Sequence, residues 1–118
     1  FLGVRITHIE PGKLTAEMEV SERLLTPIGN MHGGVLAAMC DHVLGCVCYP
    51  HMRKGQWAAT MEFKLNLLAP VSSGKVIAVA ELIAMTKSTA VVRIDVTNEG
   101  RACCAAQGTV LIRDPRPA

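Results

Sequence analysis

The chain has 118 residues, of which 50% are hydrophobic and 19% charged, so it can form one compact core but not a second domain with its own interior. Its 12 Lys and Arg against 10 Asp and Glu give a net charge of +2, and no basic run is longer than Arg53-Lys54. The chain also has only one Trp, one Tyr and two Phe. The scattered basic residues and the few aromatic ones argue against nucleic acid as a partner, because nucleic-acid-binding proteins concentrate basic and stacking side chains on one face.

Two short strands and a loop open the chain. Residues Gly3 to Glu10 read as a strand, and Pro11-Gly12 mark the turn that follows it. From Lys13 to Val20 apolar and polar side chains alternate, which predicts a strand with one buried face. Ser21 to Leu25 can form one helical turn, and Thr26 to Met31 is predicted to be a loop because of its Pro and Gly residues.

The stretch from Gly33 to Tyr49, ended by Pro50, predicts one long helix that is apolar on every side. Such a helix is normally buried, and a buried carboxylate costs several kcal/mol unless it is hydrogen-bonded or has a chemical task. We therefore expect Asp41 to lie in the interior and to serve a reaction. Asp41 and His42 interrupt the apolar run before it reaches the roughly 18 residues of a membrane span, so we expect a soluble, cytoplasmic protein with no membrane contact and no signal peptide.

Four longer strands follow the helix, separated by turn residues. Their connections are short, which favours an antiparallel meander. One helix wrapped by a curved antiparallel sheet is the simplest way to bury an apolar helix in so short a chain. We expect a single domain over residues 1–113 and a disordered or frayed tail over residues 114–118. The strands are predicted over Trp57–Leu68, Lys75–Met85, Thr89–Thr97 and Arg101–Ile112.

The cysteines argue against disulfides and against a metal site. There are five of them, an odd number, and no C-x-x-C pair. Three lie in the predicted helix and two are adjacent in the last strand, which favours small hydrophobic core residues in a reducing compartment over zinc ligands. We therefore expect no metal.

Two glycines at the start of the predicted helix suit an anion. Gly33 and Gly34 let a ligand approach backbone N–H groups that have no intrahelical partner, and the helix dipole adds to the attraction. Such donors can stabilise the oxyanion of a carbonyl group by about 3 kcal/mol in a transition state. The alternative that the glycines only permit close packing stays open.

Asp41 lies eight residues after Gly33, which places it roughly 12 Å along the helix axis. One carbonyl group cannot contact both residues, so a shared reaction requires two copies of the chain, with their helices antiparallel across a two-fold axis. The sequence therefore predicts a homodimer. The alternative for Asp41 is a buried carboxylate that binds loop amides.

Other polar residues are weaker candidates. The hydroxyl of Thr60 could orient a water molecule for Asp41, and His32 is interpreted as a structural partner at the helix start. His42 points about 100° away from Asp41 around the helix, so we expect it to face a strand or a subunit contact. The hairpin Lys87-Ser88-Thr89 is either a binding site for a phosphate or an amide, or a solvated turn.

These residues stand in an order that resembles a known family. The segment Thr26-Pro27-Ile28-Gly29-Asn30-Met31-His32-Gly33-Gly34 is followed by Asp41, by Thr60-Met61-Glu62-Phe63-Lys64-Leu65-Asn66-Leu67-Leu68-Ala69-Pro70 and by Gly74. This pattern, which spans nearly the whole chain, is similar to that of the hot-dog-fold acyl-CoA thioesterases, in particular the phenylacetate-pathway (PaaI-like) branch of the 4-hydroxybenzoyl-CoA thioesterase superfamily.

The resemblance implies an α+β hot-dog fold, with one long central helix wrapped by a curved five- or six-stranded antiparallel sheet. It also implies homodimers that join their sheets edge to edge, often paired into homotetramers, with active sites at the dimer interface. The implied reaction is hydrolysis of the thioester of a small or medium acyl-CoA. Coenzyme A is then part of the substrate, and no separate cofactor is expected.

The resemblance also implies roles for individual residues. Asp41 is implied to be the general base or the nucleophile, Gly33 the donor to the oxyanion, and Thr60 the hydroxyl that holds the hydrolytic water. The hairpin at residues 87–89 is implied to meet pantetheine or nucleotide phosphates. The residues implied to bind substrate are Thr26, His32, Gly34, Lys87, Ser88 and Thr89.

One position departs from the family pattern. Six residues before His32 these families usually carry Asn or Gln, whose amide positions the thioester or the water. Here Thr26 stands in that place, and its hydroxyl reaches less far. Asn30 lies nearby but at a different register, so the role is not assigned to it.

Three other functions remain open. A non-catalytic acyl-CoA-binding or sensing module is made more credible by Thr26. A hot-dog hydratase or dehydratase would use a His with an acid on β-hydroxyacyl substrates. A purely structural dimeric scaffold is the third alternative.

Overall fold

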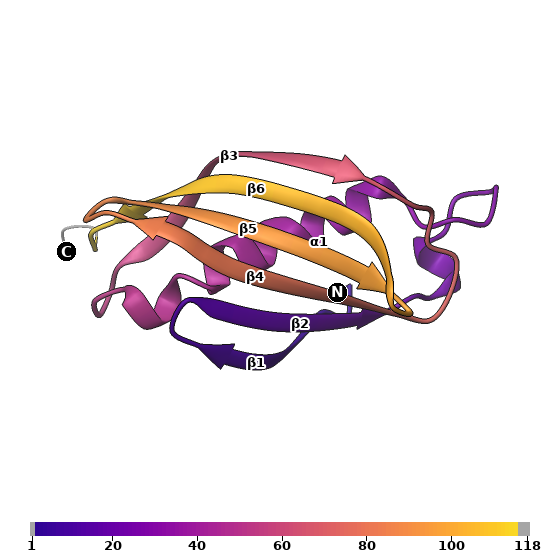
Figure 1. The fold of residues 1–118 in the computed structure, drawn as a ribbon, viewed down its shortest axis with the longest axis horizontal. Helices are drawn as coiled ribbons and strands as arrows, with labels where there is room; N and C mark the ends of the chain where they lie inside the picture. Colours follow the sequence, from indigo (N-terminus) through magenta and orange to yellow (C-terminus); the bar gives the residue numbers. More distant parts are fainter. Residues whose placement is uncertain (1, 116–118) are drawn as a thin grey trace.

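The computed structural model describes residues 2–115. The strands form one six-stranded sheet in the order β1-β2-β4-β5-β6-β3, with every neighbouring pair antiparallel, and α1 packs along one face of it (Figure 1). The expected α+β class, one helix against a curved antiparallel sheet, is confirmed. The elements are β1 (Arg5–Glu10), β2 (Lys13–Glu19), α1 (Gly33–Cys46), β3 (Trp57–Leu67), β4 (Lys75–Met85), β5 (Thr89–Asn98) and β6 (Arg101–Arg113), with short 3₁₀ turns at Glu22–Leu24 and Tyr49–His51.

The helix begins at Gly33, as predicted, but ends at Cys46 rather than at Tyr49. Pro50 has no N–H to donate to a carbonyl one turn back, and its ring clashes with a continuing α-helix. The chain therefore leaves the α-helix before the proline. It makes a separate 3₁₀ turn, Tyr49–His51, with the proline in its first positions.

The position of β3 differs from the predicted meander. β4, β5 and β6 follow one another as expected, but β3 pairs with β6 at the far edge, and β2 occupies the place beside β4. Residues 68–74 therefore pass the ends of β6 and β5 before β4 begins. Neighbouring strands lie about 4.8 Å apart, so even this short connection spans three strand spacings, and its length did not identify the partner of β3.

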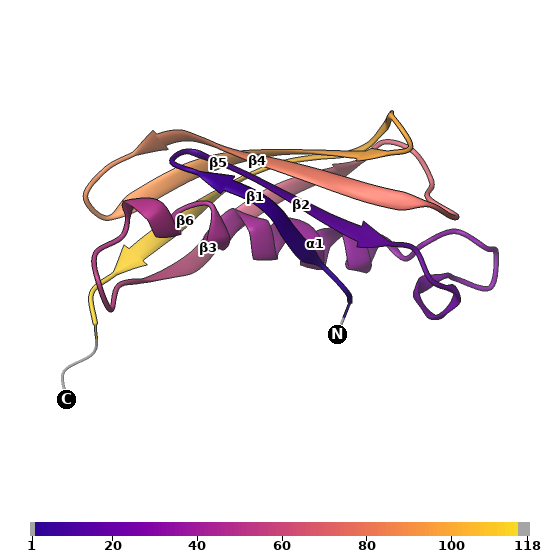
Figure 2. The same cartoon turned by 90° about the horizontal axis from the view of Figure 1, so that it is seen from below.

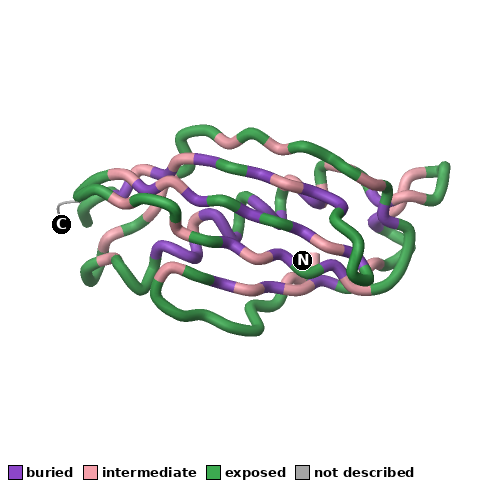
Figure 3. The backbone as a smooth tube through the Cα atoms, viewed as in Figure 1, coloured by how far each residue is buried: buried purple, intermediate pink, exposed green. Residues whose placement is uncertain are grey.

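The core lies between α1 and the sheet. Along the central strands buried and exposed residues alternate (Figure 3), and β2 shows the predicted alternation, with Leu14, Ala16 and Met18 buried. Burying a side chain the size of leucine or methionine contributes about 1.5–3 kcal/mol. The buried side chains of α1 are Leu36, Met39, Cys40, Val43, Leu44 and Cys46.

The other side of α1 is uncovered, which corrects the expectation that Asp41 lies in the interior. Gly34, Ala38, Asp41 and His42 are all exposed, and the sheet covers the helix from one side only (Figure 2). One sheet is one layer and cannot enclose a helix. Part of this apolar helix therefore faces away from the sheet.

Residues Gly33–His51 are long and apolar enough to pass as a membrane span by length and composition, with a mean hydropathy of 1.2. The expectation that Asp41 and His42 would prevent this was wrong. In the fold, however, this stretch contains fully buried core residues such as Met39 and Leu44. Its apolar character is that of a core helix packed on a sheet.

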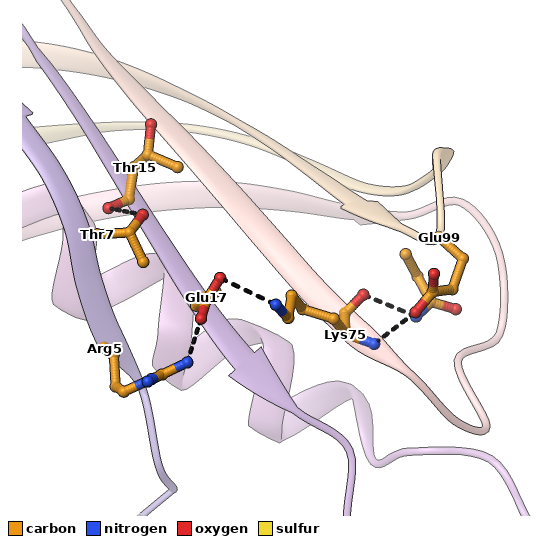
Figure 4. A network of polar contacts seen from close by, with 7 residues as sticks. Arg5, Thr7, Thr15, Glu17, Lys75 and Glu99 are labelled. Atoms are coloured by element: carbon orange, nitrogen blue, oxygen red, sulfur yellow. Dashed lines mark hydrogen bonds and ion pairs between the residues drawn. The ribbon is translucent and has the colours of Figure 1, made fainter.

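A chain of polar contacts joins one end of the sheet. The Glu17 carboxylate on β2 pairs with Arg5 on β1 and lies 3.5 Å from Lys75 Nζ on β4. The backbone N–H of Lys75 donates to Glu99 Oε1 at 2.8 Å, which connects β4 to the β5–β6 turn (Figure 4). The Glu17 side chain is mostly buried while Arg5 and Lys75 reach it from the surface, and the network links β1, β2, β4 and the β5–β6 turn.

The five cysteines are free and buried, as predicted for core residues. Burial, and secondarily the neighbouring Cys46, raises the pKa of Cys48 to about 11. Burial also raises the pKa of Cys46. Within residues 2–115 no three His, Cys, Asp or Glu side chains are grouped to hold a metal ion.

Alkylation should reveal this burial. At about pH 8.5, near the ordinary pKa of a free thiol, Cys48 stays protonated in the folded protein because its pKa lies near 11. We expect iodoacetamide to leave Cys48 unmodified under native conditions and to modify it in urea, as measured by mass spectrometry. Rapid labelling of the native protein would contradict the buried placement.

A second test concerns the close approach of β3 to β6 at Gly108. A Cβ atom there would lie 2.5 Å from Phe63 Cβ and 2.7 Å from Glu62 O. We expect Gly108→Ala to lower the free energy of unfolding by about 1–3 kcal/mol, as measured by urea titration. The matched control is Gly45→Ala, whose Cβ would meet only Ala58 Cβ at 4.0 Å and whose helical position should leave stability equal or higher.

Candidate active site

A hydroxyl from the edge strand holds the carboxylate of Asp41. The Oγ1 atom of Thr60 on β3 donates to Asp41 Oδ1 at 2.7 Å, and both residues are exposed. β3 is irregular next to this point, with a bulge between Thr60 and Glu62 in its pairing with β6. The hydrogen bond occupies one carboxylate oxygen, and Oδ2 remains able to accept a proton or a further hydrogen bond.

The start of α1 presents backbone donors without a side-chain cap. Gly33 is the first helical residue, and His32 at the N-cap position makes no side-chain capping bond. The His32 side chain is exposed and does not cap the helix, so its role as a structural partner stays a prediction. Instead, its backbone N–H donates to Leu24 O at 3.1 Å. The first N–H groups of a helix lack intrahelical acceptors, so the Gly33 amide is free to meet a ligand oxygen.

A surface hollow of about 270 Å³ opens beside Gly33. A Cβ atom on Gly33 would lie 2.7 Å from Leu67 Cδ1, so glycine is needed for the side chain of Leu67 to pack where it does. The side chains that line the hollow are mostly apolar, and part of the lining comes from the connection between β3 and β4. The hollow is lined by Asn30, Met31, Gly33, Leu36, Leu67, Leu68, Ala69, Pro70 and Val71.

Hydrogen bonds from other segments hold the connection between β3 and β4, which forms one wall of the hollow. Arg101 Nη2 donates to Pro70 O at 2.7 Å, and Met31 N donates to Val71 O at 2.6 Å. The buried Asn98 donates through Nδ2 to Ser73 O at 3.0 Å and to Lys75 O at 3.1 Å. Sequence reasoning missed these supports, because a carbonyl bound across the sheet end leaves no signal in local composition.

Within one chain the two groups of candidate residues do not meet. Gly33 and Asp41 lie roughly 12 Å apart along the helix axis, and neither Asp41 nor Thr60 lines the hollow beside Gly33. One copy of the chain therefore carries two separate groups of candidate residues. The first is the acid and hydroxyl pair, and the second is the backbone donor beside the hollow.

Thr26 is engaged within its own loop. Its Oγ1 donates to Asn30 Oδ1 at 2.9 Å and accepts the Ile28 backbone N–H at 3.2 Å. Its backbone N–H donates to Asn30 O at 2.7 Å. The structure thus places Thr26 next to Asn30, and of the two only Asn30 lines the hollow beside Gly33.

The hairpin Lys87-Ser88-Thr89 lies at the opposite end of the molecule from the loop of residues 26–31 (Figure 1). The Thr86 hydroxyl accepts the backbone N–H groups of Ser88 and Thr89 at 3.3 and 3.0 Å. Lys87 lines a separate open hollow of about 500 Å³ with His51 and Arg53. In a single chain this hairpin is therefore not part of the Gly33 site.

His42 is turned away from the carboxylate beside it in sequence. Its Nε2 lies 3.7 Å from Cys46 Sγ on the next helical turn. With Leu2, Val4 and Ala38 it lines a shallow hollow on the uncovered side of α1. Leu2 and Val4 precede β1 and belong to no strand, so the subunit contact predicted for His42 stays a prediction.

Comparison with known proteins gives a consistent family. Residues 28–105 match the thioesterase superfamily. The chain is 30% identical over 116 residues to a 1,4-dihydroxy-2-naphthoyl-CoA hydrolase of Listeria monocytogenes, covering 98% of this chain and 94% of that protein.

Solved structures share the fold over nearly the whole chain. A hypothetical thioesterase protein of Streptococcus pneumoniae, solved with coenzyme A, superposes with a TM-score of 0.88 at 26% identity over 99% of this chain and 91% of its own. A thioesterase of Staphylococcus aureus superposes with a TM-score of 0.91 at 26% identity over 95% of this chain and 94% of its own. The latter was solved as two variants, with a glutamine or a glutamate replaced by alanine. The chain therefore belongs to the thioesterase superfamily, as a thioester hydrolase of the hot-dog-fold acyl-CoA thioesterases.

Proposed function

We propose that this protein hydrolyses the thioester of a small or medium acyl-CoA at two equivalent sites on a homodimer. Each site combines Asp41 and Thr60 of one protomer with the Gly33 amide of the other. The observation that carries the proposal is the 2.7 Å hydrogen bond from Thr60 to Asp41 on the uncovered side of α1. This pair stands roughly 12 Å from the Gly33 amide of its own chain, so a second copy must supply the donor.

The proposed chemistry is base-assisted hydrolysis. Asp41 Oδ2 takes a proton from water as the water oxygen attacks the thioester carbonyl carbon. The carbonyl π electrons move onto its oxygen, where the Gly33 N–H and the helix dipole stabilise the negative charge. The C–S bond then breaks, and the thiolate of coenzyme A takes the proton from Asp41.

Direct attack by Asp41 is the alternative to the base mechanism. It would form a mixed anhydride between the Asp41 side chain and the acyl group. A single turnover quenched in acid and digested for mass spectrometry separates the two routes, because only direct attack leaves acyl mass on the peptide containing Asp41.

Two features of the fold support the dimer. β3 is an edge strand that pairs with β6 on one side, and Met61 and Leu67 on it are 60% and 56% exposed. Such an edge favours pairing with another strand. The uncovered face of α1 carries the small residues Gly34 and Ala38, so another helix can approach it closely. Association of two dimers into a tetramer remains a prediction from the family resemblance.

The relatives support the substrate class and the site. One relative is named a hydrolase of an acyl-CoA, and another was solved with coenzyme A. The glutamine and the glutamate replaced in the Staphylococcus aureus thioesterase are separated by the same number of residues as Thr26 and Asp41 here. That spacing supports a catalytic carboxylate at Asp41. Five free thiols also fit a reducing compartment such as the cytoplasm.

Replacing the acid tests its role directly. We expect Asp41→Asn to lower kcat by about 10²- to 10⁴-fold, the usual contribution of a general base, and Thr60→Val to cause a smaller loss. Thiol release from acetyl-, hexanoyl- and benzoyl-CoA is the measurement. The matched control is His42→Ala, since His42 is exposed beside Asp41 but turned away from it. Full activity of Asp41→Asn on every ester would refute the assignment.

Complementation tests the shared site. Gly33→Pro removes one N–H group, while proline suits the first helical position and His32, at φ −59 and ψ 135, already has the backbone required before proline. Both Gly33→Pro and Asp41→Asn should be nearly inactive alone. Refolded together, they should recover about a quarter of wild-type activity, because half of the dimers are mixed and each mixed dimer has one unaltered site.

Gly33→Ala is the control for that experiment. It keeps the N–H group but carries the same Cβ contact with Leu67, so activity lost in Gly33→Pro and kept in Gly33→Ala belongs to the amide. Native mass spectrometry verifies that mixed dimers form. Mixed dimers without recovered activity would show that no site is shared between protomers.

A further inference from the structure

We propose that Asn30 is the second hydrogen-bond donor to the thioester carbonyl oxygen, beside the Gly33 amide, and that Thr26 is the positioning residue that orients it. The inference rests on the proposed hydrolysis and names a substrate-binding residue that the family pattern does not supply. It arises from the position where this chain departs from that pattern.

The first step is the lining of the hollow beside Gly33. Of the residues that line it, Asn30 is the one with a polar side chain, and the others are glycine, proline or hydrophobic. A hollow whose lining side chains are apolar except for one or two placed polar groups is typical of a ligand site in which the polar groups fix orientation. Asn30 and Gly33 border the same hollow, which is the premise for assigning both to one ligand oxygen.

The second step is the direction in which the Asn30 amide can act. A carboxamide has an oxygen that accepts and a nitrogen with two hydrogens that donate. The Thr26 hydroxyl donates to Asn30 Oδ1 at 2.9 Å, so the accepting side is already engaged within the loop. What Asn30 offers to a ligand is the N–H donor side, which matches a carbonyl oxygen that gains negative charge.

The third step is the rigidity of the loop. Thr26 N donates to Asn30 O at 2.7 Å, and Gly29 N donates to Thr26 O at 2.9 Å. The loop is closed further by the bridge between Leu25 and Met31. Donors that are already in place when charge develops stabilise a transition state without a cost of reorganisation. The Asn30 side chain is thus held before substrate arrives.

These steps explain how the chain can function with Thr26 at the position where the family usually has Asn or Gln. The Staphylococcus aureus thioesterase has a glutamine at the matching spacing from its glutamate. Here a hydroxyl stands in that place and the carboxamide comes from Asn30, four residues later. When water attacks the carbonyl carbon and the π electrons move to oxygen, that oxygen receives one N–H from Gly33 and one from Asn30.

The test separates donation from orientation. We expect Asn30→Ala and Asn30→Asp to lower kcat for hexanoyl-CoA by about 10²-fold, the loss typical of one oxyanion donor, with KM changed much less. Thr26→Val, which keeps the shape and removes the hydroxyl, should lower kcat by about tenfold through misplacement of the amide. Thr26→Ser keeps the hydroxyl and should restore kcat. A purely structural role would lower thermal stability without this split between kcat and KM.

A binding measurement keeps the test independent of turnover. The side-chain amide signals of ¹⁵N-labelled Asn30, identified by their loss in Asn30→Ala, should shift when acetonyl-CoA is added. This probe replaces the thioester with a ketone that is not hydrolysed. Unmoved signals, or wild-type kcat in Asn30→Ala while Asp41→Asn is inactive, would overturn the role of Asn30 and leave the proposed hydrolysis standing. Full activity of Asp41→Asn would instead overturn the proposed active site. In that case the shift of the Asn30 amide signals on addition of acetonyl-CoA would show whether Asn30 still binds the ligand carbonyl.

Discussion

A single sheet covers one side of an apolar helix, and the arrangement of this protein follows from that limit. α1 places its large side chains against the sheet, and small residues together with Asp41 lie on the uncovered side. The Thr60 hydroxyl then fixes the carboxylate from the edge strand β3. The acid therefore stands where the fold is incomplete, so closing the hydrophobic surface by a second copy and assembling a reaction centre are the same event in the proposed dimer.

The hollow beside Gly33 is partly formed by two connecting segments whose positions depend on hydrogen bonds. The loop of residues 26–30 is closed by Thr26, and the connection of residues 68–74 is held by Asn98 at the end of β5 and Arg101 at the start of β6. Loops that are held in this way on a rigid sheet lose little conformational entropy when their groups bind a ligand. The position of the helix start relative to the hollow is thus set by the sheet.

Much of the fold followed from the sequence because alternation, turn residues and the Gly-rich helix start are local signals. The strand beside β4 could not be predicted, since the length of the connection at residues 68–74 permits more than one partner for β3. The order of the motif identified Asp41, Gly33 and Thr60 as candidates, but their exposure depends on how many layers cover α1. The orientation of Asn30 by Thr26 is a contact between side chains within a loop, and composition alone does not distinguish it from a neighbour that faces solvent.

Thioester hydrolysis of an acyl-CoA releases a free thiol, and oxidised coenzyme A can attach to exposed cysteines by disulfide exchange, which requires a thiolate. All five cysteine side chains of this chain lie inside the fold, and burial disfavours ionisation of the Cys48 and Cys46 thiols. Burial therefore keeps the Cys46 and Cys48 thiols protonated and poorly reactive toward a disulfide of coenzyme A.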